Sequence, residues 1–314
     1  MAHTWTTTEL LAAVRAYGRL SEDDPDATDA NLLLEADRQM ETVFVPVVRK
    51  ARSDFYVTWE DQDLVASQAG YRIPWRATGG VVRRVCLYDT SNLIERAELM
   101  PVALDQITST SGEPTCYAIR DDQVILDPKP VSATYDLRIY YERRPSTLVV
   151  ASSAGAIATI SSQSSTSLVV PTSTLSTIAS GDLADVVCRN PPFSLYVSGA
   201  TATVAAGSIT IAKGTQDRTV AVGDYLCEVG ETPIPQIPAE LHPHLAKATA
   251  ARYLLPIDRQ AAADLIADMQ AGLASAVALL TPRQIGRQQK MKSTNSLLRR
   301  GNNRRRGGFS DFTP

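Results

Sequence analysis

Few side chains in this sequence have the types and spacings that catalysis requires. His242 and His244 form the only close histidine pair, and imidazole can serve as a metal ligand or a general base. Glu240 is the only acid nearby, however, and Pro243 between the histidines suits the first turn of a helix. We therefore expect both imidazoles to pack at a helix start. The only other histidine, His3, leaves catalysis few candidates.

Established catalytic and phosphate-binding motifs are absent from the sequence. The chain contains no G-x-x-x-x-G-K-[ST], strand-linked G-x-G-x-x-G, H-E-x-x-H or G-x-S-x-G, and residues 212–215 only imitate a phosphate loop. The acidic run at 22–26 could bind a cation but better suits a solvated turn before a helix. We predict no enzymatic activity, cofactor or metal site.

The four cysteines lie far apart and form no C-x-x-C motif. We therefore predict reduced, buried thiols instead of a zinc site or a disulfide framework. These cysteines are Cys86, Cys116, Cys188 and Cys227.

The composition is that of a globular protein. Of 314 residues, 44% are hydrophobic and 21% are charged, which is too apolar for a disordered chain. No apolar run reaches the ~18 residues that a membrane span requires, so we expect no membrane protein. Residues 1–10 lack the basic and apolar regions of a signal peptide, so we do not expect secretion.

Charge is distributed unevenly along the chain. Residues 283–314 hold nine basic residues against one acid, Asp311, a formal charge of +8. The whole chain carries −3, so residues 1–282 carry −11. An acidic body with a basic tail indicates a protein that binds a partner.

Helical patterns open the chain. Thr6 and Glu9 form a predicted capping box before an apolar stripe that ends near Gly18. Thr28 is the predicted N-cap of a second helix, which Pro46 should kink or divide.

Beyond these helices the apolar period becomes that of β-strands. Segments 81–88 and 93–100 predict short strands, and 117–126 predicts a hairpin that turns at Asp121-Asp122. The clearest strand is 135–141, in which Leu137 and its alternate neighbours face one way while Asp136, Arg138 and Tyr140 face the other.

Residues 146–180 contain 17 Ser or Thr and no charged residue. A flexible linker is one interpretation. We favour strands, because β-branched runs recur at 156–160, 167–170, 185–188, 194–197 and 207–211, separated by Gly, Pro and Ser. A last strand at 224–228 should complete a small antiparallel sandwich or barrel.

Helical periodicity returns after a proline-rich connector at 230–238. The apolar residues predict one helix from about 241 to 255 and another of about six turns from 257 to 280. The fold class is therefore α+β, a helical bundle of N- and C-terminal helices with an inserted antiparallel β region. The predicted domains are 1–56 with 239–282 (helical), 57–145 (mixed strand and hairpin), 146–229 (Ser/Thr-rich β), the connector 230–238 and the basic tail 283–314.

The tail combines arginine clusters with apolar side chains. This combination favours docking onto a protein surface, since binding to DNA alone needs only the charge. Two alternatives remain open: direct binding of nucleic acid by the Arg-rich tail, and a solvated tail without a partner. The predicted docking residues are Arg283, Lys290, Lys292, Leu297, Leu298, Arg299, Arg300, Arg304, Arg305, Arg306, Phe309 and Phe312.

A third alternative is a glycan-binding β module. Trp5, Trp59 and Trp75 all lie outside 146–229, so that region has no tryptophan on which a sugar could stack.

Several phrases of the sequence are together similar to a known family. They are the helix pair 7–54, YRIPWRATGG (71–80) before VRRV (82–85), IYYERRP (139–145), VGDYLC (222–227), TPIPQIPAELHP (232–243) and LTPR (280–283). On these segments the chain resembles the head-to-tail adaptor (connector or neck) proteins of tailed bacteriophages. The similarity spans most of the chain and consists of structural phrases, without catalytic motifs.

The resemblance implies a ring of twelve copies beneath the portal, which extends the DNA channel and offers a platform for the tail. The implied partners are the portal protein, a tail or nozzle protein, further copies of the chain and genomic double-stranded DNA, with no membrane. The implied location is the neck of the virion, after synthesis in the host bacterial cytoplasm. The family's extension toward the portal corresponds to 283–314.

The connector and the helix start after it are expected to hold neighbouring copies in register within a closed ring. The residues predicted for this role are Pro233, Pro235, Pro238 and His242.

Overall fold

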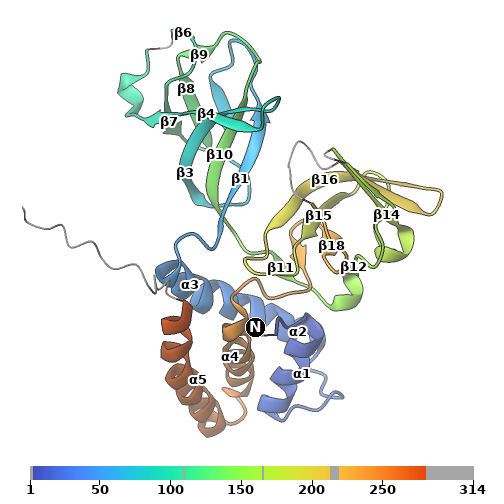
Figure 1. Cartoon of the computed structure of the whole chain (residues 1–314). Helices are drawn as coiled ribbons and strands as arrows, with labels where there is room; N and C mark the ends of the chain where they lie inside the picture. The colour runs from blue at the N-terminus through green and yellow to red at the C-terminus, as the bar shows by residue number, and fades with distance from the viewer. Residues whose placement is uncertain (1–2, 109, 165, 213–218, 281–314) are drawn as a thin grey trace, which may run out of the picture. The chain divides into compact units, whose positions relative to one another are not determined.

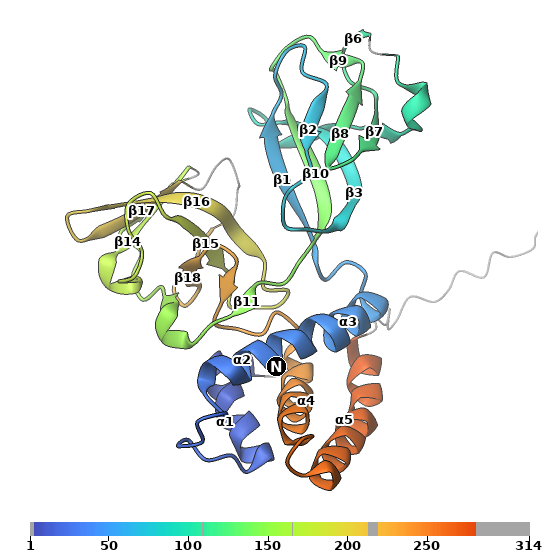
Figure 2. The same ribbon diagram turned by 180° about the vertical axis from the view of Figure 1, so that it is seen from behind.

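The computed structural model describes residues 3–108, 110–164, 166–212 and 219–280. Helices lie at both ends of the described chain and antiparallel strands lie between them (Figures 1 and 2). The predicted α+β class is therefore confirmed. The predicted tail, 283–314, lies outside the described residues, and the predicted domain boundaries stay predictions.

The first helices begin and end where their caps predict. Helix α1 (Thr7–Gly18) has Thr6 as N-cap in a capping box with Glu9, and α2 (Asp29–Gln39) begins after the N-cap Thr28. A π-helical turn, η1 (Met40–Phe44), then leads into α3 (Val45–Ala51). Pro46 is the second residue of α3, and the backbone stays helical from η1 into α3. The predicted division near Val45 therefore takes the form of a change from π-helical to α-helical turns, without a break in the helix.

The last helices return to the first ones. After η5 (Ala239–Leu241), helix α4 (His242–Leu254) contacts α1, α2 and α5 (Arg259–Leu280), and α3 contacts α5. One apolar core includes residues from both ends of the chain, among them Leu10, Phe44, Leu245 and Met269. Helices that are distant in sequence therefore bury their apolar faces on one another.

Helix α5 corrects one expectation from the sequence. Its 22 residues are long and apolar enough, by length and composition alone, to cross a membrane, and only 17% of its apolar window is buried. Asp264 and Asp268 interrupt its apolar residues, so the absence of an uninterrupted apolar run of ~18 residues did not exclude a helix of this length and composition. One such helix is weak evidence for a membrane span, because core helices of soluble proteins meet the same criteria.

The first β region is built on a four-stranded antiparallel sheet of order β1-β10-β3-β4. Leu137, Ile139 and Tyr141 of β10 face its core together with Val85 and Leu87 of β3, as the alternation in 135–141 predicts. The strands are β1 (Val57–Asp63), β3 (Ala77–Asp89), β4 (Ile94–Glu98) and β10 (Asp136–Arg143).

A second small sheet of order β2-β8-β7-β5 and a two-stranded sheet of β6 and β9 complete this region. The predicted hairpin is confirmed, because β7 and β8 pair antiparallel around Asp121-Asp122. The predicted strand at 93–100 is divided into β4 and β5. The remaining elements are β2 (Gly70–Arg72), β5 (Met100–Pro101), η2 (Leu104–Gln106), β6 (Ser111–Gly112), β7 (Cys116–Arg120), β8 (Gln123–Asp127) and β9 (Lys129–Pro130).

The Ser/Thr-rich segment enters a seven-stranded sheet of order β12-β18-β15-β16-β17-β14-β13. Its own apolar core includes Ile157, Val186, Ile209 and Leu226, so the prediction of strands is confirmed. Of the strand predicted at 156–160, however, only Ala156 lies in a strand, β12. The elements are β11 (Thr147–Leu148), η3 (Ala151–Ser153), β12 (Gly155–Ala156), β13 (Ser162–Gln163), β14 (Ser167–Pro171), η4 (Thr172–Thr174), β15 (Leu183–Val187), β16 (Leu195–Ala205), β17 (Ser208–Ala212), β18 (Tyr225–Glu228) and β19 (Glu231–Thr232).

Candidate functional site

The proline-rich connector is buried within the protein. Pro233, Pro235 and Pro238 are all buried. The Pro233 carbonyl accepts a hydrogen bond from the Thr7 N–H at 2.8 Å, and the Tyr56 hydroxyl donates to the Gln236 carbonyl at 3.0 Å. Any effect of these prolines on contacts between copies would therefore be indirect, and that role stays a prediction.

The His242 side chain hydrogen-bonds both to the connector and to the start of the chain. Its Nδ1 accepts from the Trp5 N–H at 3.0 Å, and its Nε2 lies 3.0 Å from the Ile237 carbonyl, to which it donates in the neutral form. Burial lowers the pKa of His242 to about 4, outweighing the two backbone hydrogen bonds that would raise it. Both ring nitrogens are thus engaged in packing at a helix start, as predicted.

His244 packs between the last two helices. An added Cβ on Gly272 of α5 would lie 2.4 Å from the His244 ring. Burial, and then the nearby Lys247, lower the pKa of this imidazole. The histidine pair therefore serves two packing contacts and does not converge on one site.

A buried ion pair joins the two β regions. The Arg76 guanidinium donates to the carboxylate of Asp185 and to the Ser146 hydroxyl. Asp185 also accepts from the Gly199 N–H at 2.7 Å and from the Gly230 N–H at 2.9 Å. Arg76 and Asp185 are both almost fully buried, so each needs the other to offset its lost hydration.

Arg143 lies beside this pair, and its guanidinium has fewer compensating hydrogen bonds than that of Arg76. It is 2% exposed, and its Nη1 has no hydrogen-bond partner within the part of the chain that the structure describes. Burial, and then the like charge of Arg76, lower its pKa to about 10. No local sequence pattern predicts this cluster, because its members are spread from position 76 to position 185.

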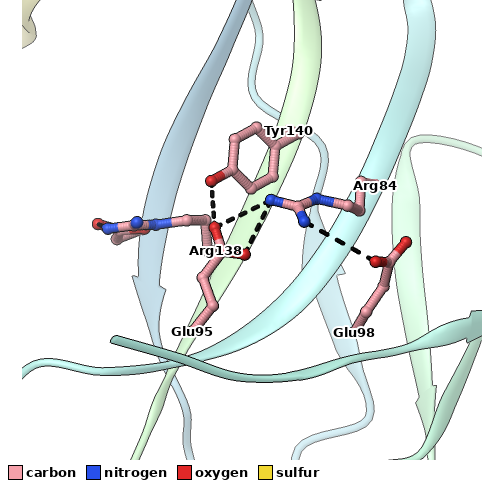
Figure 3. Close-up of polar contacts among 6 residues, drawn as sticks. Arg84, Glu95, Glu98, Arg138 and Tyr140 are labelled. Atoms are coloured by element: carbon pink, nitrogen blue, oxygen red, sulfur yellow. Dashed lines mark hydrogen bonds and ion pairs between the residues drawn. The ribbon is translucent and has the colours of Figure 1, made fainter. Parts of the chain in front are cut away.

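The outer face of the four-stranded sheet carries an array of arginine, acidic and aromatic side chains (Figure 3). Arg84 lies between two acids of β4. It donates to both carboxylate oxygens of Glu95 at 2.9 Å and pairs with Glu98 at 3.8 Å. Its guanidinium lies over the Tyr140 ring, 4.3 Å from the centroid, while the Tyr140 hydroxyl donates to Glu95.

Arg138 continues the array along β10. Its guanidinium donates two hydrogen bonds to Asp61, at 2.7 and 2.8 Å. It also lies over the Tyr88 ring at 3.4 Å and near the Trp59 ring at 5.3 Å. Arginine, tyrosine and tryptophan are the residues that dominate protein-binding surfaces, so this ordered face is a candidate contact surface.

The sequence supplied part of the signal for this surface. The alternation in β10 placed Arg138 and Tyr140 on its outer face. The alternation could not predict that Arg84 and Glu95 join them, because the positions of these two residues depend on how β3 pairs with β10 and β4.

Other predicted site residues do not converge in the described structure. The four cysteines are free, with Cys86, Cys188 and Cys227 buried and Cys116 half-buried. Among the described residues no group of three or more His, Cys, Asp or Glu side chains is placed to hold a metal ion. The predicted docking residues from Arg283 to Phe312 lie outside the described residues.

The architecture defines an α+β protein whose terminal helices share one core and whose two β regions lie between them in sequence. The model of the SU10 adaptor protein family matches residues 5–170, more than half of the chain. The chain belongs to this family and is therefore a structural adaptor protein of bacteriophages. Membership implies a virion component at the head–tail junction that contacts other head and tail proteins. No curated protein matches the chain.

Proposed function

We propose that this chain is the subunit of a ring attached beneath the portal at the head–tail junction. The observation that carries the proposal is the family match over residues 5–170. In the ring, the helices of both chain ends act as one bundle, the twelve copies extend the DNA channel, and the assembly offers a platform for a tail or nozzle protein. The protein performs no catalytic reaction.

The charge of the chain supports a channel for DNA. Residues 1–282 carry a formal charge of −11. Acidic walls repel phosphate, so DNA can pass without being held. The basic tail at 283–314 is then reserved for docking onto the portal.

Electron microscopy of the full chain mixed with purified portal tests the proposal. We expect a second ring stacked on the portal ring. A chain that stays monomeric and does not bind the portal would overturn the proposal.

A nucleic-acid-binding function is the second candidate, favoured by the Arg-rich tail. It predicts DNA affinity that falls steeply with salt and disappears when residues 283–314 are removed. A mobility-shift assay of the full and shortened chains at low and high salt measures this. Salt-sensitive DNA binding without any portal binding would favour this second function.

A further inference from the structure

Helix α5 presents an apolar surface that the other described elements leave largely uncovered. Met269, Ala276 and Leu280 face the helical core, yet only 17% of the apolar window of α5 is buried. Large apolar side chains are exposed at both ends of this surface, with Ile257 66% and Leu279 74% exposed. Alanine is the most frequent exposed residue between them, with Asp264, Asp268 and Gln270 among the others. An exposed helix face that is mainly apolar suits contact with another molecule.

A second partly apolar feature is a groove beside α1. Its volume is about 670 Å³. One wall comes from α1 and the residues that follow it, and the other from the start of η3. The lining that the argument uses consists of Leu11, Ala12, Ala16, Leu20, Val150 and Ala151.

The α5 surface and the α1 groove lie on opposite sides of α4. Helix α4 contacts both α1 and α5, and both views show it between them (Figures 1 and 2). On α1, Tyr17 faces α4, since Lys247 of α4 lies 5.5 Å from its ring. Ala12 and Ala16 project from other sides of α1 and line the groove. One chain therefore cannot place its own α5 in its own groove.

Charge adds an orientation to this arrangement. Arg252 and Arg259 flank the exposed Leu255 at the turn between α4 and α5. The loop after α1 carries exposed acids at Glu22 and Asp23. Tyr253 donates to Asp24 at 3.0 Å, so the basic turn and the acidic loop lie at the same end of the helices. A neighbour related by rotation about an axis parallel to these helices would thus bring its basic turn toward the acidic loop.

We infer that α5 and the α4–α5 turn of one copy dock into the α1 groove of a second copy of this chain. The contact uses two different surfaces, so it is heterologous, and repetition around an axis closes a ring. Helices α5, α4 and α1 of successive copies would then form one continuous belt. This inference rests on the proposed ring and specifies which surfaces form it.

Cysteine cross-linking tests the contact. In the full chain with Cys116→Ser, we introduce Ala12→Cys in the groove and Ala271→Cys on the exposed side of α5. Oxidation of the portal-bound material should give a ladder of disulfide-linked multimers for the double variant. Each single variant should give no ladder, and neither should a control pair of Ala12→Cys with Val131→Cys, which lies on an exposed part of the β region.

A charge placed on α5 gives an independent readout. Ala271→Glu should abolish assembly on the portal and leave the thermal melt of the free chain unchanged, because Ala271 is exposed. Ala205→Glu, an exposed change on β16 away from both surfaces, should assemble normally.

The outcomes separate this inference from the proposed function. Rings on the portal without a ladder, or rings formed by the Ala271→Glu chain, overturn the α5–α1 contact and leave the adaptor ring standing. Failure of the unchanged chain to form rings on the portal overturns both.

Discussion

At the scale of single residues, the buried ionisable side chains hold distant segments together. His242 joins the connector to Trp5, and Asp185 accepts one charged and two backbone donors. Asp37 accepts the Leu148 N–H with both carboxylate oxygens, at 2.9 and 3.0 Å. Burying each of these groups without its hydrogen bonds costs free energy. Substitutions that break these bonds should therefore lower the free energy of unfolding.

Replacing Asp185 should destabilise the fold strongly. Asp185→Asn keeps the shape of the side chain but leaves the Arg76 charge buried and uncompensated. We expect the free energy of unfolding to fall by about 3–5 kcal/mol, measured by urea unfolding. Asp122→Asn, which removes an exposed carboxylate near Arg72, should change it by no more than about 0.5 kcal/mol. Equal effects of the two substitutions would contradict the role of the buried pair.

His242 should make stability depend on pH. The pKa of His242 is about 4 in the folded chain, against ~6.5 in an unfolded chain. Between these values only the unfolded chain binds the proton. The contribution of His242 to the free energy of unfolding should therefore be fully present above pH 6.5. Below that pH it should fall by about 1.4 kcal/mol per pH unit, down to pH 4.

Asp37 acts in the opposite direction, so the His242 effect must be isolated. Burial raises the pKa of Asp37 to about 7, so the folded chain gains stability as pH falls from 7 toward the ordinary carboxylate range. The comparison is therefore the unchanged chain against His242→Gln, unfolded in urea across this pH range. Their difference should shrink toward pH 4; a constant difference would refute the assignment.

At the scale of elements, close approach of helices depends on small residues at specific positions. Gly272 of α5 lies against His244 of α4, where an added Cβ would come within 2.4 Å of the ring. The two helices are therefore held at a distance that a larger residue at 272 would change.

Gly272→Ala should destabilise the α4–α5 contact although alanine favours helix. Alanine gains about 1 kcal/mol in an exposed helix, whereas overpacking costs about 1–3 kcal/mol. We expect a net loss of about 1 kcal/mol in the free energy of unfolding, from these two opposing effects. Gly272→Ala should instead stabilise a His244→Ala chain, because the ring is then absent. Destabilisation of equal size in both backgrounds would exclude this contact as the cause.

At the scale of the whole molecule, every described member of the apolar cores precedes the basic tail. The helical core and the two β cores all lie within residues 3–280. Folding and attachment to a partner should therefore be separable.

Truncation after Thr281 should leave the chain folded and abolish its attachment to the portal. The cores keep all their described members, while the predicted docking residues are removed. Thermal melts measure the first effect and co-sedimentation with portal the second. Attachment by the truncated chain would show that docking lies elsewhere.

Local chemistry in the sequence determined the ends and types of many elements. The Thr6–Glu9 capping box, the N-cap Thr28, the division at Pro46 and the hairpin around Asp121-Asp122 all depend on residues a few positions apart. Such signals act within a turn or two of the chain, so they can be recognised without knowledge of the fold.

Tertiary structure alone decided which distant residues meet. Arg76 and Asp185 are 109 positions apart, and Trp5 and His242 are 237 apart; neither pair shares a local pattern. The strand 156–160 was shortened to β12 because pairing depends on the neighbouring strand β18. The exposed face of α5 was equally hidden, because an apolar stripe shows that a helix can be buried and only packing shows how much of it is.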